Sequence, residues 1–164
     1  MPVTLHRAAP FDLPIIKNLV PYYIYDMSEY LLWPTKPDGR YDGCDGIEAY
    51  WSDPDKHAFL LRSGRELAGF VLLLEGNHGP DIDYSFTDFF VLRKFRHRRV
   101  GERIARQFFK RFPGRWQVDH LTQNKPAAIF WRKVITRYTR GNFKTKSARS
   151  KEGPVTVMQF TTRR

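Results

Sequence analysis

The most informative segment of this chain is Asp88-Phe-Phe-Val-Leu-Arg-Lys-Phe-Arg-His-Arg-Arg-Val-Gly-Glu-Arg-Ile-Ala105. Its aromatic and branched start is typical of a strand, and a short basic turn follows. A helix begins near Val100, because Val100, Ile104 and Phe108 recur at helical spacing. A helix N-terminus offers unpaired N–H groups and partial positive charge, so this strand, turn and helix predict a site for pyrophosphate.

The side chains of the turn support the same prediction. Gly101 allows a ligand to approach the helix backbone closely. Four arginines, Arg96, Arg98, Arg99 and Arg103, would add positive charge and paired donors. The segment has neither the Gly-Lys-Ser/Thr of a Walker loop nor a Gly-x-Gly-x-x-Gly turn. From these residues alone, a solvated basic helix entrance is the open alternative.

The composition indicates a single folded domain over residues 1–164. Hydrophobic residues make up 41% and aromatic residues 15%, enough for a core, which excludes a wholly disordered chain. No apolar run approaches the ~20 residues that cross a bilayer, and residues 1–7 lack a signal-peptide core, so we expect a cytoplasmic location and no membrane partner. Cys44 is the only cysteine and the histidines show no metal spacing, so we expect no disulfide and no metal.

The net charge of +11 is unevenly distributed along the chain. Residues 1–90 hold 7 Lys/Arg and 14 Asp/Glu, a net −7, and residues 91–164 hold 21 and 3, a net +18. The basic part suits nucleic acid, a membrane surface or a small polyanionic ligand. The acidic part argues against a simple nucleic-acid coat, and the split indicates two sites that prefer ligands of opposite charge.

Hydrophobic periodicity and turn residues predict alternating strands and helices. We predict strands at 3–7, 57–62, 66–74, 84–92, 116–121, 138–143 and 155–162, and helices at 13–31, 47–51, 100–112 and 126–135. Asp12 is expected to cap the first helix, and Pro21 to kink it or divide it into two abutting helices. Residues 144–154 are expected to form a loop. This order predicts a mixed α/β or α+β fold.

Two motifs resemble those of the GNAT N-acetyltransferase superfamily. Its acetyl-CoA motif is Arg/Gln-x-x-Gly-x-Gly/Ala, and Arg96, Arg99 and Gly101 fall on the three fixed positions. Residues 88–92 also look like the corresponding strand of diamine acetyltransferases. The segment Asn124-Lys-Pro-Ala-Ala-Ile-Phe-Trp-Arg-Lys-Val is similar to the second family signature. The order of elements fits along nearly the whole chain.

The resemblance implies a fold and a co-substrate. The fold is a mostly antiparallel central sheet flanked by helices, with acetyl-CoA in a cleft where strand 88–92 splays from strand 116–121. The backbones of Val91 and Arg93 would pair with the pantetheine arm, and Asn124 would touch that arm. The pyrophosphate would lie on the amides of Arg98, Arg99, Val100, Gly101, Glu102 and Arg103. Residues 1–90 would form the acceptor side and residues 91–164 the acetyl-CoA side.

The resemblance also implies a reaction, direct transfer of acetyl to a primary amine of a small molecule or peptide. A base must take the amine proton. Asp88 is the candidate, because burial on an apolar strand face raises the pKa of a carboxyl group. A structural acid, or one that orients the amine, is the alternative. A homodimer is an allowed assembly, and nucleic acid is not an expected partner.

The sequence departs from the family pattern at two positions. Arg99 replaces the first glycine of the motif, and a left-handed backbone there would cost ~1–2 kcal/mol. The tyrosine that often serves as acid in the family falls at Trp131, which is no proton donor to sulfur. A non-catalytic acetyl-CoA binder and a basic nucleic-acid-binding module are therefore the alternatives. Tyr138 is expected to pack, His120 is a minor candidate near the site, and Cys44 is expected to be a bystander.

The acceptor preference is predicted from residues 22–55. They hold eight acids and eight large aromatic residues, and only two bases, Lys36 and Arg40. Carboxylates with aromatic faces attract cationic amines through ion pairing and cation–π contact. We therefore predict a cationic acceptor bound in part by Asp26 and Glu29. The alternative is that the aromatic residues form core and the acids merely offset the basic part.

Overall fold

A computed structural model of the chain, which describes residues 2–41, 43, 45–76 and 81–163, has seven strands in the order β1-β2-β3-β4-β5-β7-β6. The mixed α+β class and the mostly antiparallel sheet are confirmed. The strands are β1 (Val3–Arg7), β2 (Lys56–Ser63), β3 (Glu66–Glu75), β4 (Tyr84–Val91), β5 (Arg115–Leu121), β6 (Lys144–Ser150) and β7 (Gly153–Thr161). The helices are η1 (Pro10–Asp12), α1 (Leu13–Leu31), α2 (Ala49–Ser52), η2 (Arg93–Phe95), α3 (Val100–Arg111) and α4 (Lys125–Thr139).

The chain divides into two compact units whose sequences interleave. Unit 1 is Met1–Leu73 with Thr87–Phe95, and unit 2 is Leu74–Phe86 with Arg96–Arg164. The strands β3 and β4 contribute residues to both units. The functional halves expected at 1–90 and 91–164 stay a prediction.

Unit 1 has a core between α1 and the strands β2, β3 and β4. Buried positions on α1 recur at the spacing of one helix face: Ile16, Leu19, Val20 and Ile24. They pack with Leu60, Phe70 and Phe90 of the strands. Because β2 and β3 are buried along most of their length, their sequences are nearly continuous apolar runs.

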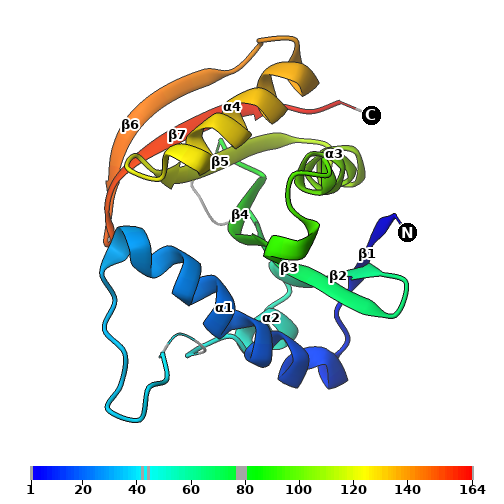
Figure 1. Cartoon of the computed structure of the whole chain (residues 1–164). Coiled ribbons are helices and arrows are strands. Elements are labelled where there is room, and N and C mark those ends of the chain that lie inside the picture. Colours follow the sequence, from blue (N-terminus) through cyan, green and yellow to red (C-terminus); the bar gives the residue numbers. More distant parts are fainter. Residues whose placement is uncertain (1, 42, 44, 77–80, 164) are drawn as a thin grey trace. The chain divides into compact units, whose positions relative to one another are not determined.

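The start and middle of α1 differ from the sequence-based expectations. Pro21 lies within one continuous helix, so two abutting helices are excluded (Figure 1). Asp12 makes no side-chain cap to α1, because η1 runs directly into that helix and leaves Asp12 with helical backbone angles. Its carboxylate instead accepts the N–H of Ala9 at 2.9 Å, which closes η1.

Unit 2 is built around packed aromatic rings. Phe86 of β4 lies 5.0 Å from Trp116 of β5 and 5.2 Å from Phe108 of α3, ring centroid to centroid. Phe109 of α3 contacts Trp116 and Phe160 of β7 at 5.1 and 5.0 Å. In this unit α4 packs on β5 and β7 (Figure 1). The apolar residues that recur at helical spacing from Val100 onward thus form the buried face of α3.

The strand expected at 138–143 is wrong. Helix α4 continues to Thr139 because Tyr138 extends its apolar face onto Phe109, and it ends at Arg140, which is left-handed. The sixth strand is Lys144–Ser150, in the segment expected to be a loop. It pairs antiparallel with β7 along its length but is exposed on both faces, so its sequence lacks the apolar alternation that predicts a strand.

Candidate functional site

Unit 1 contains a cavity of about 660 Å³ between α1, the following loop and the sheet. Its walls include five aromatic residues, Tyr23, Trp33, Tyr41, Tyr50 and Phe70. The strand β4 contributes Thr87 and Asp88. This volume lies within the range of pockets that bind small molecules. The cavity thus brings Asp45 and four of the aromatic residues of segment 22–55 together with Asp88, the predicted base.

The walls of the cavity are held by tight local packing. Tyr23 meets the rings of Phe70 and Phe90 edge-on, with centroids 6.1 and 5.8 Å away. Gly43 lies so close to α1 that a Cβ there would collide with the side chain of Ile24. The absence of a side chain at Gly43 therefore lets the loop approach α1 and form one wall of the cavity.

The charges lining the cavity are negative. Asp45 and Asp88 line it, and no described lining residue is lysine, arginine or histidine. The negative charge of the lining is a local property of the cavity, because the chain as a whole carries a net charge of +11. Two carboxylates among aromatic rings favour a cation over an anion.

Tyr50 provides a hydroxyl donor beside Asp88. Its OH donates to the Oγ1 of Thr87 at 2.8 Å. Burial, with a smaller contribution from the charge of Asp88, raises the pKa of Tyr50 to about 12, although the bond to Thr87 opposes this rise. Tyr50 therefore keeps its proton at neutral pH and acts as a donor.

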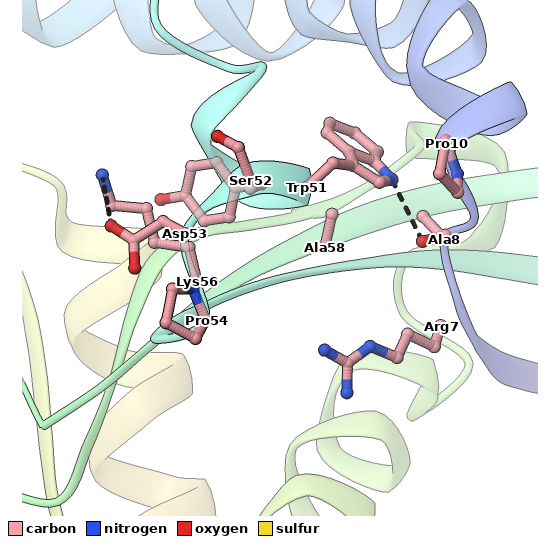
Figure 2. A pocket seen from close by; sticks show the side chains of 10 residues that line it. Arg7, Ala8, Pro10, Trp51, Ser52, Asp53, Pro54, Lys56 and Ala58 are labelled. Atoms are coloured by element: carbon pink, nitrogen blue, oxygen red, sulfur yellow. Dashed lines mark hydrogen bonds and ion pairs between the residues drawn. The ribbon is translucent and has the colours of Figure 1, made fainter.

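A smaller hollow of about 340 Å³ is lined by residues of α2 and its neighbours and shares Tyr50 with the cavity. Figure 2 shows its lining residues, with the indole Nε1 of Trp51 donating to the carbonyl of Ala8 at 3.1 Å. Lys56 and Asp53 pair at 3.5 Å. These contacts anchor α2, and with it Tyr50. Sequence reasoning missed this role of Trp51, because the four-residue helix α2 is too short to show a periodic pattern.

The prediction that Asp26 and Glu29 bind the acceptor does not fit the cavity. Neither residue lines it, and the carboxylate of Asp26 accepts two hydrogen bonds from the guanidinium of Arg93. The reason is that Asp26 does not lie on the face of α1 that lines the cavity. Val20, Tyr23 and Ile24 face the cavity, whereas Asp26 points to the end of β4. Of the eight acids in residues 22–55, Asp42 lies outside the described residues.

In unit 2 the basic turn leads directly into α3. His97 and Arg99 both have left-handed backbones, with φ of 64° and 56°, and Arg99 is the N-cap of the helix. The left-handed backbone considered for Arg99 is thus present. Glu102, in the first turn, accepts from Arg137 of α4 at 3.1 Å, which directs its carboxylate toward α4. Oriented amides and arginines are the donor set that suits a phosphate group.

The residues predicted to contact the pantetheine arm lie partly in unit 1 and partly in unit 2. Val91 ends β4 and Arg93 begins η2, both in unit 1, and the N–H of Leu92 between them donates to the carbonyl of Ala68 at 2.9 Å. Asn124 in unit 2 caps α4, its side chain accepting from the N–H of Ala127 at 3.0 Å. Within unit 2, the parallel pairing of β4 with β5 covers only Tyr84–Trp116 and Ser85–Gln117.

Comparison with known proteins identifies the family. The sequence matches the acetyltransferase (GNAT) family over residues 21–135, more than half of the chain. The chain belongs to the GNAT family. A search of curated proteins gave no match.

Solved GNAT structures share the fold at low sequence identity. An acetyltransferase from Thermus thermophilus has a TM-score of 0.66 at 16% identity, covering 98% of this chain and 97% of that one. Spermidine N-acetyltransferase from Vibrio cholerae, in complex with CoA and spermine, has a TM-score of 0.67 at 15% identity, covering 98% and 95%. Ribosomal-protein-S18-alanine N-acetyltransferase from Escherichia coli has a TM-score of 0.60 at 12% identity, covering 99% and 95%.

Trp131 occupies a packed position in this GNAT chain. It is 6% exposed and stacks on Phe86, with centroids 5.5 Å apart. Tyr138 packs edge-on against Phe109, as expected, and His120 bonds to the carbonyl of Leu121. The bystander prediction for Cys44 falls on a residue outside the described part.

Two further findings concern the described part of the chain. No group of three or more His, Cys, Asp or Glu residues there is arranged to hold a metal ion. None of its helices combines the length and the apolar character that a membrane span requires.

Replacing Arg99 by glycine is expected to stabilise the fold by about 1 kcal/mol, because glycine adopts a left-handed backbone without strain. Thermal unfolding would show this as a rise in Tm of about 2–4 °C. Acetyl-CoA affinity should change less than about tenfold, since a lost charge contact and relieved crowding oppose each other. Arg98→Gly is the control, because it removes the same charge without relieving this strain. Complete loss of binding in Arg99→Gly would show instead that the side chain is essential.

Proposed function

We propose that this chain is an acetyl-CoA-dependent N-acetyltransferase that transfers acetyl directly to a primary amine of a cationic acceptor. Family membership supports the reaction type. The observation that carries the acceptor class is the 660 Å³ cavity with its aromatic walls, Asp45, Asp88 and no described cationic lining residue. A cytoplasmic location, where acetyl-CoA is supplied, is part of the proposal.

The residues present fit acetyl-CoA as co-substrate. In unit 2, the amides from Arg98 to Glu102 lie at or just before the start of α3 and would take the pyrophosphate. The N–H predicted at Arg103 is not available, because it donates to the carbonyl of Arg99 at 3.0 Å, so Arg103 would contribute its guanidinium instead. Asn124 would touch the pantetheine arm. In unit 1, the backbones of Val91 and Arg93 would pair with that arm. Acetyl-CoA supplies the acetyl group as a thioester.

The chemistry requires an unprotonated amine, since an ammonium has no lone pair. We assign the proton transfer to Asp88, which lines the cavity and would accept the amine proton directly or through water. The N–C bond forms as the C–S bond breaks, and CoA leaves as the thiolate. Trp131 offers no proton to that sulfur, so we assign its reprotonation to water.

The test is release of CoA thiol with a panel of amines matched in size but differing in charge. Cationic amines should react faster than neutral or acidic ones. Asp45→Asn should raise the KM of a cationic acceptor about two- to fivefold, the effect of one exposed ion pair, with kcat and acetyl-CoA affinity unchanged. The KM of a neutral amine should not move.

The matched control is Asp55→Asn, which removes the same charge from an exposed residue that does not line the cavity. It should leave every parameter unchanged. Preference for acidic or neutral amines would contradict the acceptor class. Acetyl-CoA binding without CoA release for any amine would identify a non-catalytic binder, and stabilisation by oligonucleotide but not acetyl-CoA would favour a nucleic-acid-binding module.

A further inference from the structure

The turn η2, which follows β4, is held by contacts from three parts of unit 1. Arg93 donates through Nε and Nη2 to one carboxylate oxygen of Asp26 in α1, at 3.1 and 2.8 Å. Lys94 donates to Glu66 of β3 at 2.6 Å. The side chain of Phe95 is buried, with 7% of its surface exposed. The backbone at the end of β4 is therefore fixed by α1, by β3 and by the core.

Asp26 links this arrangement to the helix that forms a wall of the acceptor cavity. It follows Tyr23 by three residues on α1, and Tyr23 lines the cavity. Its side chain is only 17% exposed, whereas that of Arg93 is 72% exposed. The hydrogen bonds and the charge of Asp26 raise the pKa of Arg93, which favours the charged form of this guanidinium.

We propose that Asp26 is a positioning residue for the co-substrate: it holds Arg93 and thereby fixes the backbone at the end of β4 that takes the pantetheine arm. This inference rests on the proposed function. It assigns Asp26 to acetyl-CoA binding, although Asp26 lies on the helix that forms a wall of the acceptor cavity.

A purely structural role is a weaker account of this pair. Exposed ion pairs contribute little to stability, and Arg93 is the exposed partner. Without the pair, η2 would still be held by Phe95 and by the Lys94–Glu66 contact. Loss of the pair should therefore loosen the backbone locally without unfolding the chain. A loosened binding backbone costs affinity, because it must be ordered again when the ligand binds.

The test compares Asp26→Asn with Glu29→Gln, which removes the same charge one turn along α1. Asp26→Asn should raise the Kd of acetyl-CoA, measured by calorimetry, and its KM about three- to tenfold. The acceptor KM should stay within twofold and the Tm within about 3 °C. Glu29→Gln should change neither substrate. Arg93→Gln should match Asp26→Asn, and the double variant should be no weaker than either single one.

Each of the following results would overturn the inference. A rise in acceptor KM alone would make Asp26 an acceptor ligand. Equal effects of Asp26→Asn and Glu29→Gln would indicate a general charge effect. Additive losses would show that Asp26 and Arg93 act independently. Wild-type protein that does not bind acetyl-CoA would refute the proposed function as well, whereas wild-type binding that Asp26→Asn leaves unchanged would refute this inference alone.

Discussion

Asp88→Asn is expected to lower kcat at least about 100-fold, the usual effect of removing a general base. The amide cannot accept the proton of the attacking amine, yet it has nearly the shape of the carboxylate. Acetyl-CoA affinity should be unchanged, because Asp88 lines the cavity proposed for the acceptor. The measurement is CoA release at saturating concentrations of both substrates.

The division of the effect between kcat and the acceptor KM separates a base from a simple amine ligand. Loss of a base should lower kcat with the acceptor KM retained, whereas loss of an amine ligand should raise the acceptor KM with kcat retained. Asp45→Asn is the control within the same cavity, since it removes an equal charge. Comparable losses of kcat in both variants, or a rise in acceptor KM with kcat retained, would refute the assignment of Asp88 as the base.

The second large effect is expected for Gly101→Asp, which should raise the Kd of acetyl-CoA at least tenfold. Gly101 lies in the first turn of α3, shortly after the left-handed Arg99. A carboxylate there would compete with pyrophosphate for the same amides and repel it. Because an acidic residue in the first turn of a helix is favourable, the fold should be retained.

Gly101→Asn distinguishes charge from bulk in this position. Its side chain has nearly the same size without the charge, so its effect on Kd should be clearly smaller. Calorimetric titration with acetyl-CoA gives the affinity, and thermal unfolding confirms that both variants are folded. Unchanged affinity in Gly101→Asp would remove the assignment of a phosphate site at α3.

The amino-acid sequence by itself determined most of the order of elements, the start of α3 at Val100 and the family. These properties depend on local patterns: apolar residues at helical spacing, turn residues between strands, and an arginine- and glycine-containing motif at a helix start. The sequence did not predict the strand at 144–150. Pairing with β7 makes this segment a strand, while its own residues are exposed on both faces and show no apolar alternation.

Only the tertiary structure decided which acids line the cavity of unit 1. Asp45 lies in a loop and Asp88 on a strand, so no sequence spacing relates them, yet packing places both in the lining of one cavity. Asp26 and Tyr23 lie three residues apart, a spacing that predicts one shared helix face. The carboxylate of Asp26 instead accepts a hydrogen bond from Arg93, which lies 67 residues further along the chain. The physical reason is that a side chain's direction on α1 depends on how the helix packs against β3 and β4, and the local sequence does not contain that packing.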